Sequence, residues 1–313
     1  MPNTFSIVYE FDQVSEEDSE EQKFLKDIID CLKVSAVGDK CIEFIFVSDK
    51  QLTSESISFL AELFSNLDFE LNISFLISES PGYYEKKKTG YEASSGDVVI
   101  FLDSDCIYSK DYFDMVLSGF SSSEVDIVSG RTFALTETRR DLLFALLWQF
   151  PIEGTIDPRN SIVHKWGNNF AVKREILNLS GFQTLRPARP TFRVLGFVWD
   201  SQVEMSCKRK FVDADAFHKQ FSSFKELSGR VYEQGRETQT IAKWSGVSLS
   251  SRIKHSFNGM GWNSMNRIST LSTELSLEIS TRFILSLGVF ILRASNTLGY
   301  LSSIILDRKI LIK

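Results

Sequence analysis

The stretch of residues 98–105, VVIFLDSD, constrains the fold of this chain more than any other segment. Five apolar residues follow a Ser-Gly-Asp turn and end at Asp103 and Asp105, with one serine between the two aspartates. A short apolar run bounded by turn residues predicts a strand that is buried on both faces, as strands of parallel sheets are. Because open α/β sheets bind ligands at the carboxyl ends of their strands, the two aspartates are candidates for a ligand site.

Asp103 and Asp105 are chemically suited to a metal ion. They lie two residues apart, so their side chains point to the same side if the chain stays extended. Two hard carboxylate ligands suit Mg2+ or Mn2+ that also carries phosphate oxygens, which predicts a substrate linked through a diphosphate. The Asp-Ser-Asp sequence by itself is equally typical of a helix cap or a turn, so the neighbouring motifs have to decide.

The N-terminal half of the chain repeats one pattern, in which an apolar run is followed by a polar turn and by a segment with helical spacing. Alternating units of this kind predict an α/β fold, with a Rossmann-like, mostly parallel sheet and helices on both faces. Strands are expected at residues 5–9, 42–47, 71–77 and 98–102, and helices around residues 22–32, 60–67 and 86–94.

Five motifs in a fixed order carry a family resemblance: TGYEASSGDVVIFLDSD, SKDYFDMVLSGF, WGNNFAVKREIL, FVWDSQVEMSCKRK and FHKQ. Together they resemble family 2 glycosyltransferases, which have a GT-A fold. The resemblance predicts a catalytic domain over residues 1–240 and a C-terminal helical extension over residues 241–313. It implies an inverting hexosyltransferase that uses Mn2+ or Mg2+ and a UDP- or GDP-type sugar. The implied acceptor is a glycan or a lipid-linked molecule, as in polysaccharide biosynthesis.

The resemblance also implies which residues bind the donor. Asp105 corresponds to the metal-binding aspartate, Asp103 helps to hold the nucleotide sugar, and His218 lies close to the metal or the diphosphate. Glu10 and Asp49, at the ends of the first two expected strands, correspond to positions that contact the base and the ribose. For Asp49 a turn residue is the alternative, and for His218 a structural histidine.

Basic residues in two segments are candidates for contact with the diphosphate. Lys86, Lys87 and Lys88 are consecutive and cannot share one helix face, so one or two at most would reach it, and Lys88 is the candidate. A solvated surface charge is the alternative for each of them. Arg236 lies in the segment GRVYEQGRE, residues 229–237, which is expected to form a loop that closes over the diphosphate.

The motif WGNNF resembles the segment that lines the acceptor side of the family. Trp166 offers a flat apolar face on which a sugar ring can stack, and Asn168 and Asn169 can both donate and accept hydrogen bonds. These three residues are therefore the expected acceptor contacts. An asparagine-rich turn over a buried tryptophan is the alternative.

Members of the family carry an acidic pair before a helix, and here that pair is Trp199-Asp200. Asp200 is the expected general base that deprotonates the acceptor hydroxyl, and Trp199 is an expected acceptor contact. Glu204, one helical turn later, is the alternative base if Asp200 only caps the helix. The Gln-x-x-Arg-Trp signature of processive synthases is absent, since Gln234 is followed by Gly-Arg-Glu, which predicts transfer of one sugar per encounter.

The C-terminal extension combines basic residues with an apolar stripe. From residue 241 onward nine lysines and arginines stand against three acidic residues, in a chain whose net charge is −6. Because Arg293 interrupts the apolar segment, a helix lying on an anionic membrane face is favoured over one that spans the membrane. Packing of the stripe on the catalytic domain, or on a second copy in a homodimer, is equally consistent. The stripe consists of Ile284, Leu287, Ile291, Ala294, Leu298, Leu301 and Ile305, with Arg282, Ser286, Arg293, Asn296, Tyr300 and Ser303 expected on the opposite side.

Four cysteines without metal-type spacing, and no visible signal peptide, predict a reducing, cytoplasmic location, at the inner face of the cell membrane if the helix binds there. No nucleic-acid partner is expected. Two other functions stay open. A nucleotidyltransferase of similar fold would carry a glycine-rich, basic signature after the first strand, which YEFDQV lacks. A catalytically inactive GT-A-like scaffold is kept open by Trp199, which replaces an acidic residue of the family.

Overall fold

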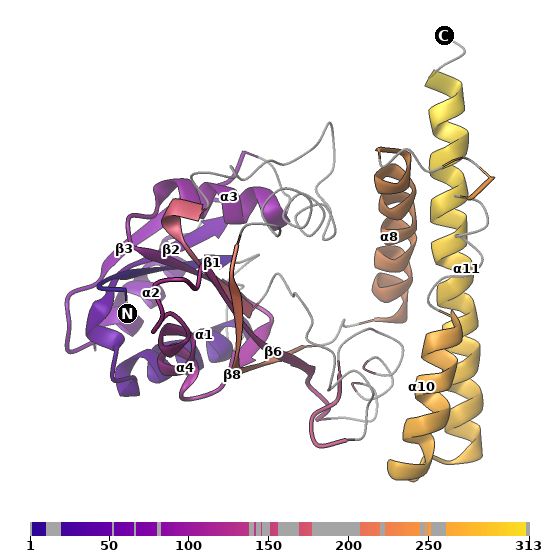
Figure 1. Ribbon diagram of the computed structural model, residues 1–313, viewed down its shortest axis with the longest axis horizontal. Coiled ribbons are helices and arrows are strands. Elements are labelled where there is room, and N and C mark those ends of the chain that lie inside the picture. The colour runs from indigo at the N-terminus through magenta and orange to yellow at the C-terminus, as the bar shows by residue number, and fades with distance from the viewer. Residues whose placement is uncertain are drawn as a thin grey trace. The chain divides into compact units, whose positions relative to one another are not determined.

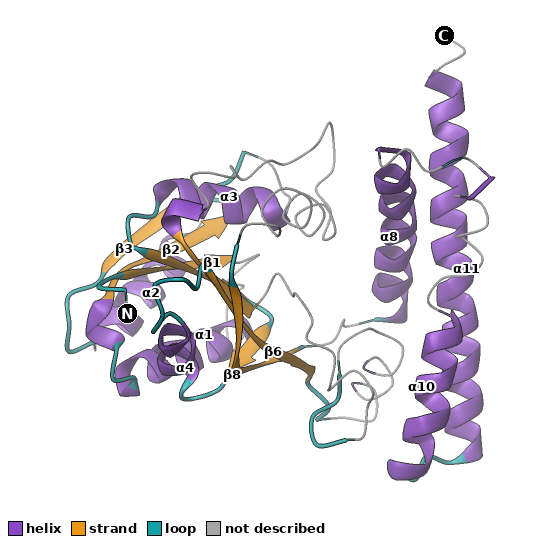
Figure 2. Ribbon diagram, in the orientation of Figure 1, coloured by secondary structure: helices purple, strands orange, loops and turns teal. Residues whose placement is uncertain are grey.

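A computed structural model describes the chain over most of its length (Figures 1 and 2). It forms two compact units, one of residues 1–133 and 163–218 and the other of residues 134–162 and 219–313. Residue 240, the expected end of the catalytic domain, lies inside helix α8. The described residues are 2–10, 20–51, 53–65, 67–79, 83–137, 141, 145, 151–155, 169–176, 207–219, 223–244, 248, 250–251 and 261–310.

The first unit alternates strands and helices along the chain, and the second is mainly helical (Figure 2). The strands are β1 (Phe5–Glu10), β2 (Cys41–Ser48), β3 (Asn72–Ile77), β4 (Val98–Asp103), β5 (Cys106–Tyr108), β6 (Ile127–Ala134), β7 (Asn169–Lys173) and β8 (Arg209–His218). The helices are α1 (Glu20–Val34), the short η1 (Gly38–Lys40), α2 (Ser54–Ser65), α3 (Tyr83–Ala93), α4 (Tyr112–Gly119), α8 (Phe224–Trp244), α10 (Gly261–Glu274) and α11 (Ile279–Ile310).

Eight strands form one mixed sheet in the order β3-β2-β1-β4-β7-β6-β8-β5. β1 pairs in parallel with β2 and β4, and β2 pairs in parallel with β3. β7 is antiparallel to both β4 and β6, and β5 is antiparallel to β8. In this register Glu10 at the end of β1 lies opposite Asp103 at the end of β4, so the two strands finish side by side.

Side-chain alternation divides the core between the two faces of the sheet. Phe5, Ile7 and Tyr9 of β1 point to the face that is covered by α1, α2 and α4. Val8 of β1 points to the other face, where Tyr91 of α3 packs (Figure 1). Because both faces are buried, the strands need apolar residues at nearly every position, which explains why FSIVY and VVIFL do not alternate with polar residues.

The α/β fold expected from the sequence is confirmed, and all strands and helices predicted in the N-terminal half are present. Two local expectations are wrong. The strand ends at Asp103 and the chain turns at Ser104 and Asp105, so the two aspartates do not share one extended segment. Residues 229–237 lie within α8 and form no loop, because the apolar and polar residues of this segment continue a helical period against α11.

In the second unit, α8 and α11 pack closely through small and polar residues (Figure 1). A methyl group added to Gly235 of α8 would overlap the carbonyl oxygen of Asn296 in α11, and one added to Gly299 would overlap the carbonyl oxygen of Tyr232. Hydrogen bonds join the two helices, among them Ser228 to Ser295 at 2.8 Å, Tyr232 to Ser302 at 2.9 Å, Asn296 to the Val231 carbonyl at 3.1 Å, and Ser303 to Gln239 at 3.1 Å.

The outer face of α11 is apolar. Phe283 and Phe290 are each 69% exposed, and the remaining members of this face are exposed as well. The expected apolar stripe is therefore present on this helix and exposed. We call the exposed set the α11 stripe: Ile279, Phe283, Ile284, Leu287, Phe290, Ile291, Leu298 and Ile305. In the part of the chain that is described, residues 279–305 form one helix long and apolar enough to cross a membrane, with a mean hydropathy of 1.4 and 33% of the apolar window buried.

Gly229 and Gly235 both lie in α8, but only Gly235 lies at the crossing with α11. Gly235→Ala should lower the free energy of unfolding by about 1–3 kcal/mol, because the new methyl group overfills the crossing. Gly229→Ala is the matched control, since nothing lies within 4 Å of an added methyl group there. The control should raise stability by about 0.5–1 kcal/mol through helix propensity. Thermal or urea unfolding of the full chain measures both, and equal stability of the two variants would contradict the crossing.

Candidate active site

The ends of β1 and β4 place two acidic side chains next to each other in the protein interior. Glu10 ends β1 and Asp103 ends β4, and the register pairs them directly. Their exposed fractions are 7% and 5%. Two ionised carboxylates this close in a dry environment would disfavour each other, so this edge of the sheet needs positive charge or a proton.

Lys86 and Lys87 of α3 supply that positive charge. The Nζ of Lys87 lies 2.6 Å from Oδ1 of Asp103 and 3.8 Å from Oε2 of Glu10. The Nζ of Lys86 lies 2.9 Å from Oε1 of Glu10. Both lysines are buried, and Lys87 is inaccessible to solvent. The strand ends and the first half of α3 therefore form one charged network inside the protein.

The geometry of α3 explains which lysines face the strand ends. Gly90 lies against the sheet so closely that a methyl group there would overlap a valine of β1. Lys86 and Lys87 precede Gly90 by four and three residues, so they lie on the same face of the helix. Lys88, the lysine expected at the donor, is half-exposed and pairs with Glu92 at 3.6 Å. The spacing from Gly90 is the sequence signal that identifies Lys86 and Lys87.

Burial changes the protonation of Glu10. Desolvation raises the pKa of Glu10 from 4.5 to about 8, while Lys87 opposes the rise, Asp103 adds to it and Lys86 opposes it. Glu10 therefore carries a proton for much of the time at neutral pH. Its Oε2 atom is buried and has no hydrogen-bond partner among the described residues. A protonated carboxyl group whose buried oxygen makes no hydrogen bond to the described residues is suited to donate one to a bound ligand.

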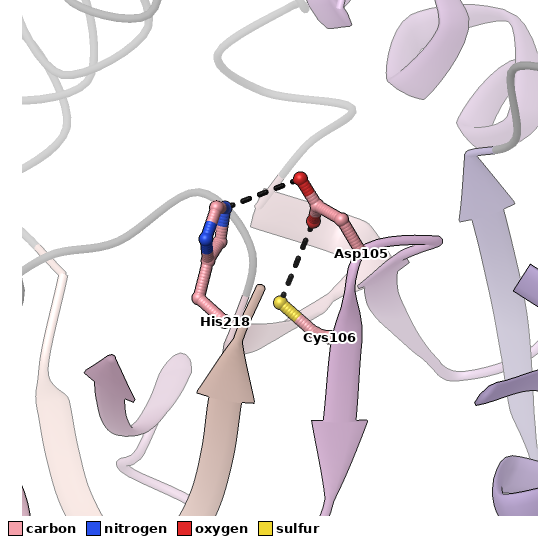
Figure 3. A group of neighbouring side chains, drawn as sticks. All are labelled: Asp105, Cys106 and His218. Carbon is pink, nitrogen blue, oxygen red and sulfur yellow. Dashed lines mark hydrogen bonds and ion pairs between the residues drawn. The ribbon is translucent and has the colours of Figure 1, made fainter. Parts of the chain in front are cut away.

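Asp105, Cys106 and His218 form a second cluster beside the strand ends, in which the three side chains point toward one another (Figure 3). The Nε2 of His218 lies 3.3 Å from Oδ2 of Asp105, and the Cys106 thiol donates to Oδ1 of Asp105 at 3.7 Å. All three ligand atoms lie within 4.8 Å of one another. Carboxylate, imidazole and thiol groups are all metal ligands, so this donor set fits a divalent cation.

Asp103 and Asp105 lie in different environments, on either side of a turn that Tyr108 stabilises. The backbone N–H of Asp103 donates to the Tyr108 hydroxyl at 2.9 Å, which anchors the turn between β4 and β5. Burial raises the pKa of Tyr108 well above 10, so the hydroxyl stays neutral. As a result Asp103 faces inward to Lys87, whereas Asp105, whose side chain is 41% exposed, faces His218.

Asn169, an expected acceptor contact, lies in the interior at the start of β7. Its Oδ1 accepts a hydrogen bond from the Tyr112 hydroxyl at 3.1 Å. Its Nδ2 donates to the backbone carbonyls of Arg131 and Ala214 at 2.8 and 2.9 Å. The side chain has no exposed surface, so the structure places it where it joins β6, β7, β8 and α4, and not where an acceptor would reach it.

The other expected site residues are placed as follows. Asp49 follows the last residue of β2 and is partly exposed. Arg236 lies on α8 in the second unit, where its guanidinium contacts Glu233 at 3.1 Å. The remaining expected residues lie outside the described part of the chain: Trp166, Asn168, Trp199 and Asp200.

A large part of the sequence matches a known family. The family model "Glycosyl transferase family 2" matches residues 19–179, just over half of the chain, so the protein belongs to glycosyl transferase family 2. It is therefore a glycosyltransferase. The matched range includes Lys86, Lys87, Asp103 and Asp105 and ends before His218.

Comparison with individual proteins agrees with this assignment. A segment of 60 residues, 19% of this chain, is 38% identical to glycosyltransferase AglE of Haloferax volcanii and spans only 20% of that protein. The mannosyltransferase PcManGT of Pyrobaculum calidifontis, in complex with GDP-Man and Mn2+, superimposes with a TM-score of 0.55 at 13% identity, covering 97% of this chain and 87% of that one. Glucosyl-3-phosphoglycerate synthase of Mycobacterium tuberculosis, in complex with Mn2+, UDP and phosphoglyceric acid, superimposes with a TM-score of 0.51 at 17% identity. The superposition covers 79% of this chain and 80% of that one. At these identities the likeness shows a shared GT-A fold.

The shifted pKa of Glu10 predicts a pH dependence of stability. The pKa of this carboxyl is raised in the folded state, so the folded protein holds a proton that the unfolded chain releases between pH 4.5 and about 8. Stability should therefore fall as pH rises through that window. Urea unfolding of the wild type and of Glu10→Gln at several pH values measures the effect. The wild type should lose stability relative to the variant with rising pH, and parallel curves would show that Glu10 ionises normally.

Proposed function

We propose that this enzyme transfers one hexosyl group per encounter from a UDP- or GDP-type sugar to a hydroxyl of a glycan or lipid-linked acceptor, with inversion at the anomeric carbon. One observation carries the proposal. At the carboxyl edge of the sheet, Asp105 contacts His218, and Asp103 of the same motif contacts the buried Lys87. That edge is where open α/β sheets bind nucleotide ligands.

Asp105 and His218 are the proposed ligands of the divalent cation. Their carboxylate and imidazole donors suit Mn2+, the ion present in the complexes of the two structural relatives. Mg2+ would be held by the same carboxylate. When bound, the cation supplies positive charge that stabilises the nucleotide diphosphate as a leaving group.

The buried network is the proposed floor of the donor site. Lys87, and not Lys88, is the lysine that faces this edge of the sheet, where it holds Asp103 in place with an ion pair of 2.6 Å. Glu10, protonated and with an Oε2 atom that accepts or donates no hydrogen bond within the described residues, is proposed to donate one to the nucleoside. Asp49 is the proposed contact of the base.

Asp200 is the proposed general base. It would take the proton of the acceptor hydroxyl while that oxygen forms a bond to the anomeric carbon and the bond from the anomeric carbon to the diphosphate oxygen breaks. Trp166, Asn168 and Trp199 are the proposed acceptor contacts. A reaction of this kind inverts the anomeric carbon because the acceptor attacks opposite the leaving group.

Two substitutions test the donor site and the base. Asp105→Ala should abolish metal-dependent binding of the donor, and Asp200→Asn should keep donor binding but lower turnover by about 10²–10⁴-fold, as loss of a general base does. Release of nucleotide diphosphate from a panel of UDP- and GDP-sugars measures turnover, and calorimetry measures binding. Asp111→Asn is the control, because Asp111 is exposed at the start of α4 and makes no side-chain cap hydrogen bond.

Each contrary outcome has its own meaning. If both variants behaved like Asp111→Asn, the metal and the base would lie elsewhere in the protein. If the wild type bound no donor at all in the presence of Mn2+ or Mg2+, the inactive scaffold would be the better description.

We also propose that the α11 stripe lies on an anionic membrane at the cytoplasmic side. The apolar stretch of 27 residues is about 40 Å long as a helix, enough for an extended contact. Its opposite face is covered by α8, a helix with charged residues such as Lys225, Glu233 and Arg236. Because lipid cannot surround α11 without also taking in the charges of α8, the helix is suited to lie on the membrane and not to cross it.

Vesicle flotation tests the membrane contact. The wild type should float with vesicles that contain anionic lipid, and Phe290→Asp should weaken binding by about tenfold or more, since a phenylalanine contributes roughly 1.5–3 kcal/mol on burial. Val34→Asp is the matched control, because Val34 is 70% exposed on α1 and lies outside the stripe. No flotation, combined with a dimer that Phe290→Asp splits in light scattering, would show that a second copy covers the stripe instead.

A further inference from the structure

Cys106 differs from the other buried cysteines in what its thiol contacts. The thiols of Cys31 and Cys41 donate to backbone carbonyls, at 3.7 and 3.6 Å, and burial raises the pKa of both. The Cys106 thiol instead meets the carboxylate of Asp105 at 3.7 Å and points toward His218 (Figure 3). It is therefore the one buried thiol in the described chain that shares its surroundings with two other metal-binding groups.

The backbone fixes this arrangement. Cys106 is the first residue of β5 and pairs directly with His218, the last residue of β8. Asp105 precedes Cys106 in the turn that follows β4. Two of the three groups are thus held by one pair of hydrogen-bonded strands, and the third is their immediate neighbour in sequence. Ligand atoms within 4.8 Å of one another need only small side-chain rotations to meet at one ion.

We propose that Cys106 is a third protein ligand of the metal site, which gives this enzyme a site that favours Zn2+ or Co2+ over Mn2+. The proposal rests on the proposed function, because it takes Asp105 and His218 as the other two ligands. Bond formation between sulfur and the ion releases the thiol proton to solvent, and the sulfur provides both electrons of the new bond. Asp105 remains partly exposed, which leaves the open side of the site to the diphosphate oxygens.

The expected selectivity follows from ligand softness. Carboxylate and imidazole groups alone accept Mn2+, whereas thiolate selects softer ions, and the general affinity order already places Co2+ and Zn2+ above Mn2+. Replacement of the sulfur by the hydroxyl of serine removes the soft ligand but retains a small polar group. Cys106→Ser should therefore weaken Zn2+ and Co2+ binding by about tenfold or more, and by a larger factor than Mn2+ binding.

Titration of the full chain with Co2+ tests the ligand directly, in the presence of a phosphine reductant so that no added thiol competes. A thiolate bound to Co2+ gives a charge-transfer band in the near ultraviolet, independent of catalytic activity. The wild type should show this band on saturation with Co2+, Cys106→Ser should lack it, and Cys207→Ser should retain it as the control for another thiol. Circular dichroism and melting of the three proteins check that each is folded.

The outcomes separate this inference from the proposed function. A Co2+ complex without the band, or a band that persists in Cys106→Ser, would overturn the role of Cys106. Mn2+-dependent donor binding that is lost in Asp105→Ala would still support the proposed donor site in that case. If neither Co2+, Zn2+ nor Mn2+ bound, both the cysteine ligand and the proposed metal site would be wrong.

Discussion

The buried contact between two lysines and two carboxyl groups fixes the functional edge of this sheet. Burial of an ion costs several kcal/mol, and the cost is offset only where partners are placed well. Lys87, with no exposed surface, meets this condition through Asp103 and Glu10, and Lys86 completes the network from the same helix face. Removal of the Asp103 carboxylate would leave the buried Lys87 without its closest partner, and breaking a buried ion pair in this way typically costs about 3–5 kcal/mol. The position of α3 and the ends of β1 and β4 therefore depend on one another.

The same network separates the chemistry of the two aspartates. The carboxylate of Asp103 is held inward by Lys87, while the backbone N–H of Asp103 donates to the Tyr108 hydroxyl. Asp105 follows after a turn and is held by His218 with part of its surface open. A side chain that is to bind a metal needs a fixed position and must stay accessible to the ion. A turn that follows a rigid strand end meets both requirements. The Asp-x-Asp motif thus provides one buried carboxylate that pairs with Lys87 and one partly exposed carboxylate beside His218.

The sequence predicts those parts of the fold that depend on the pattern of apolar and polar residues within one strand or helix. Strands such as VVIFLD have to be apolar because helices cover both faces of the sheet, so their positions follow from the sequence alone. Lys86 and Lys87 face the sheet because Gly90, on the same face of α3, lies close against β1. The number of lysines in the segment does not reveal which of them face the sheet. For α11 the period was predicted correctly, but Asn296 and Ser303 face α8 and the apolar side faces outward, since a periodic pattern does not state which face has a partner. Asn169 resembles an acceptor contact by motif, yet its contacts come from β6, β8 and α4, which only tertiary pairing brings together.

Non-local strand pairing also explains why the sequence alone does not identify Cys106 as a member of the proposed metal site. Cys106 and His218 are more than a hundred residues apart, and they become neighbours only because β5 and β8 are antiparallel and in this register. A shift of the register by one residue would turn either side chain to the opposite face of the sheet. Hydrogen bonds between the two strands therefore bring the sulfur close to the imidazole, and small side-chain rotations would complete the proposed site. The proposed metal site therefore depends on sheet topology for its assembly, and on the kinds of ligand that it brings together for its metal preference.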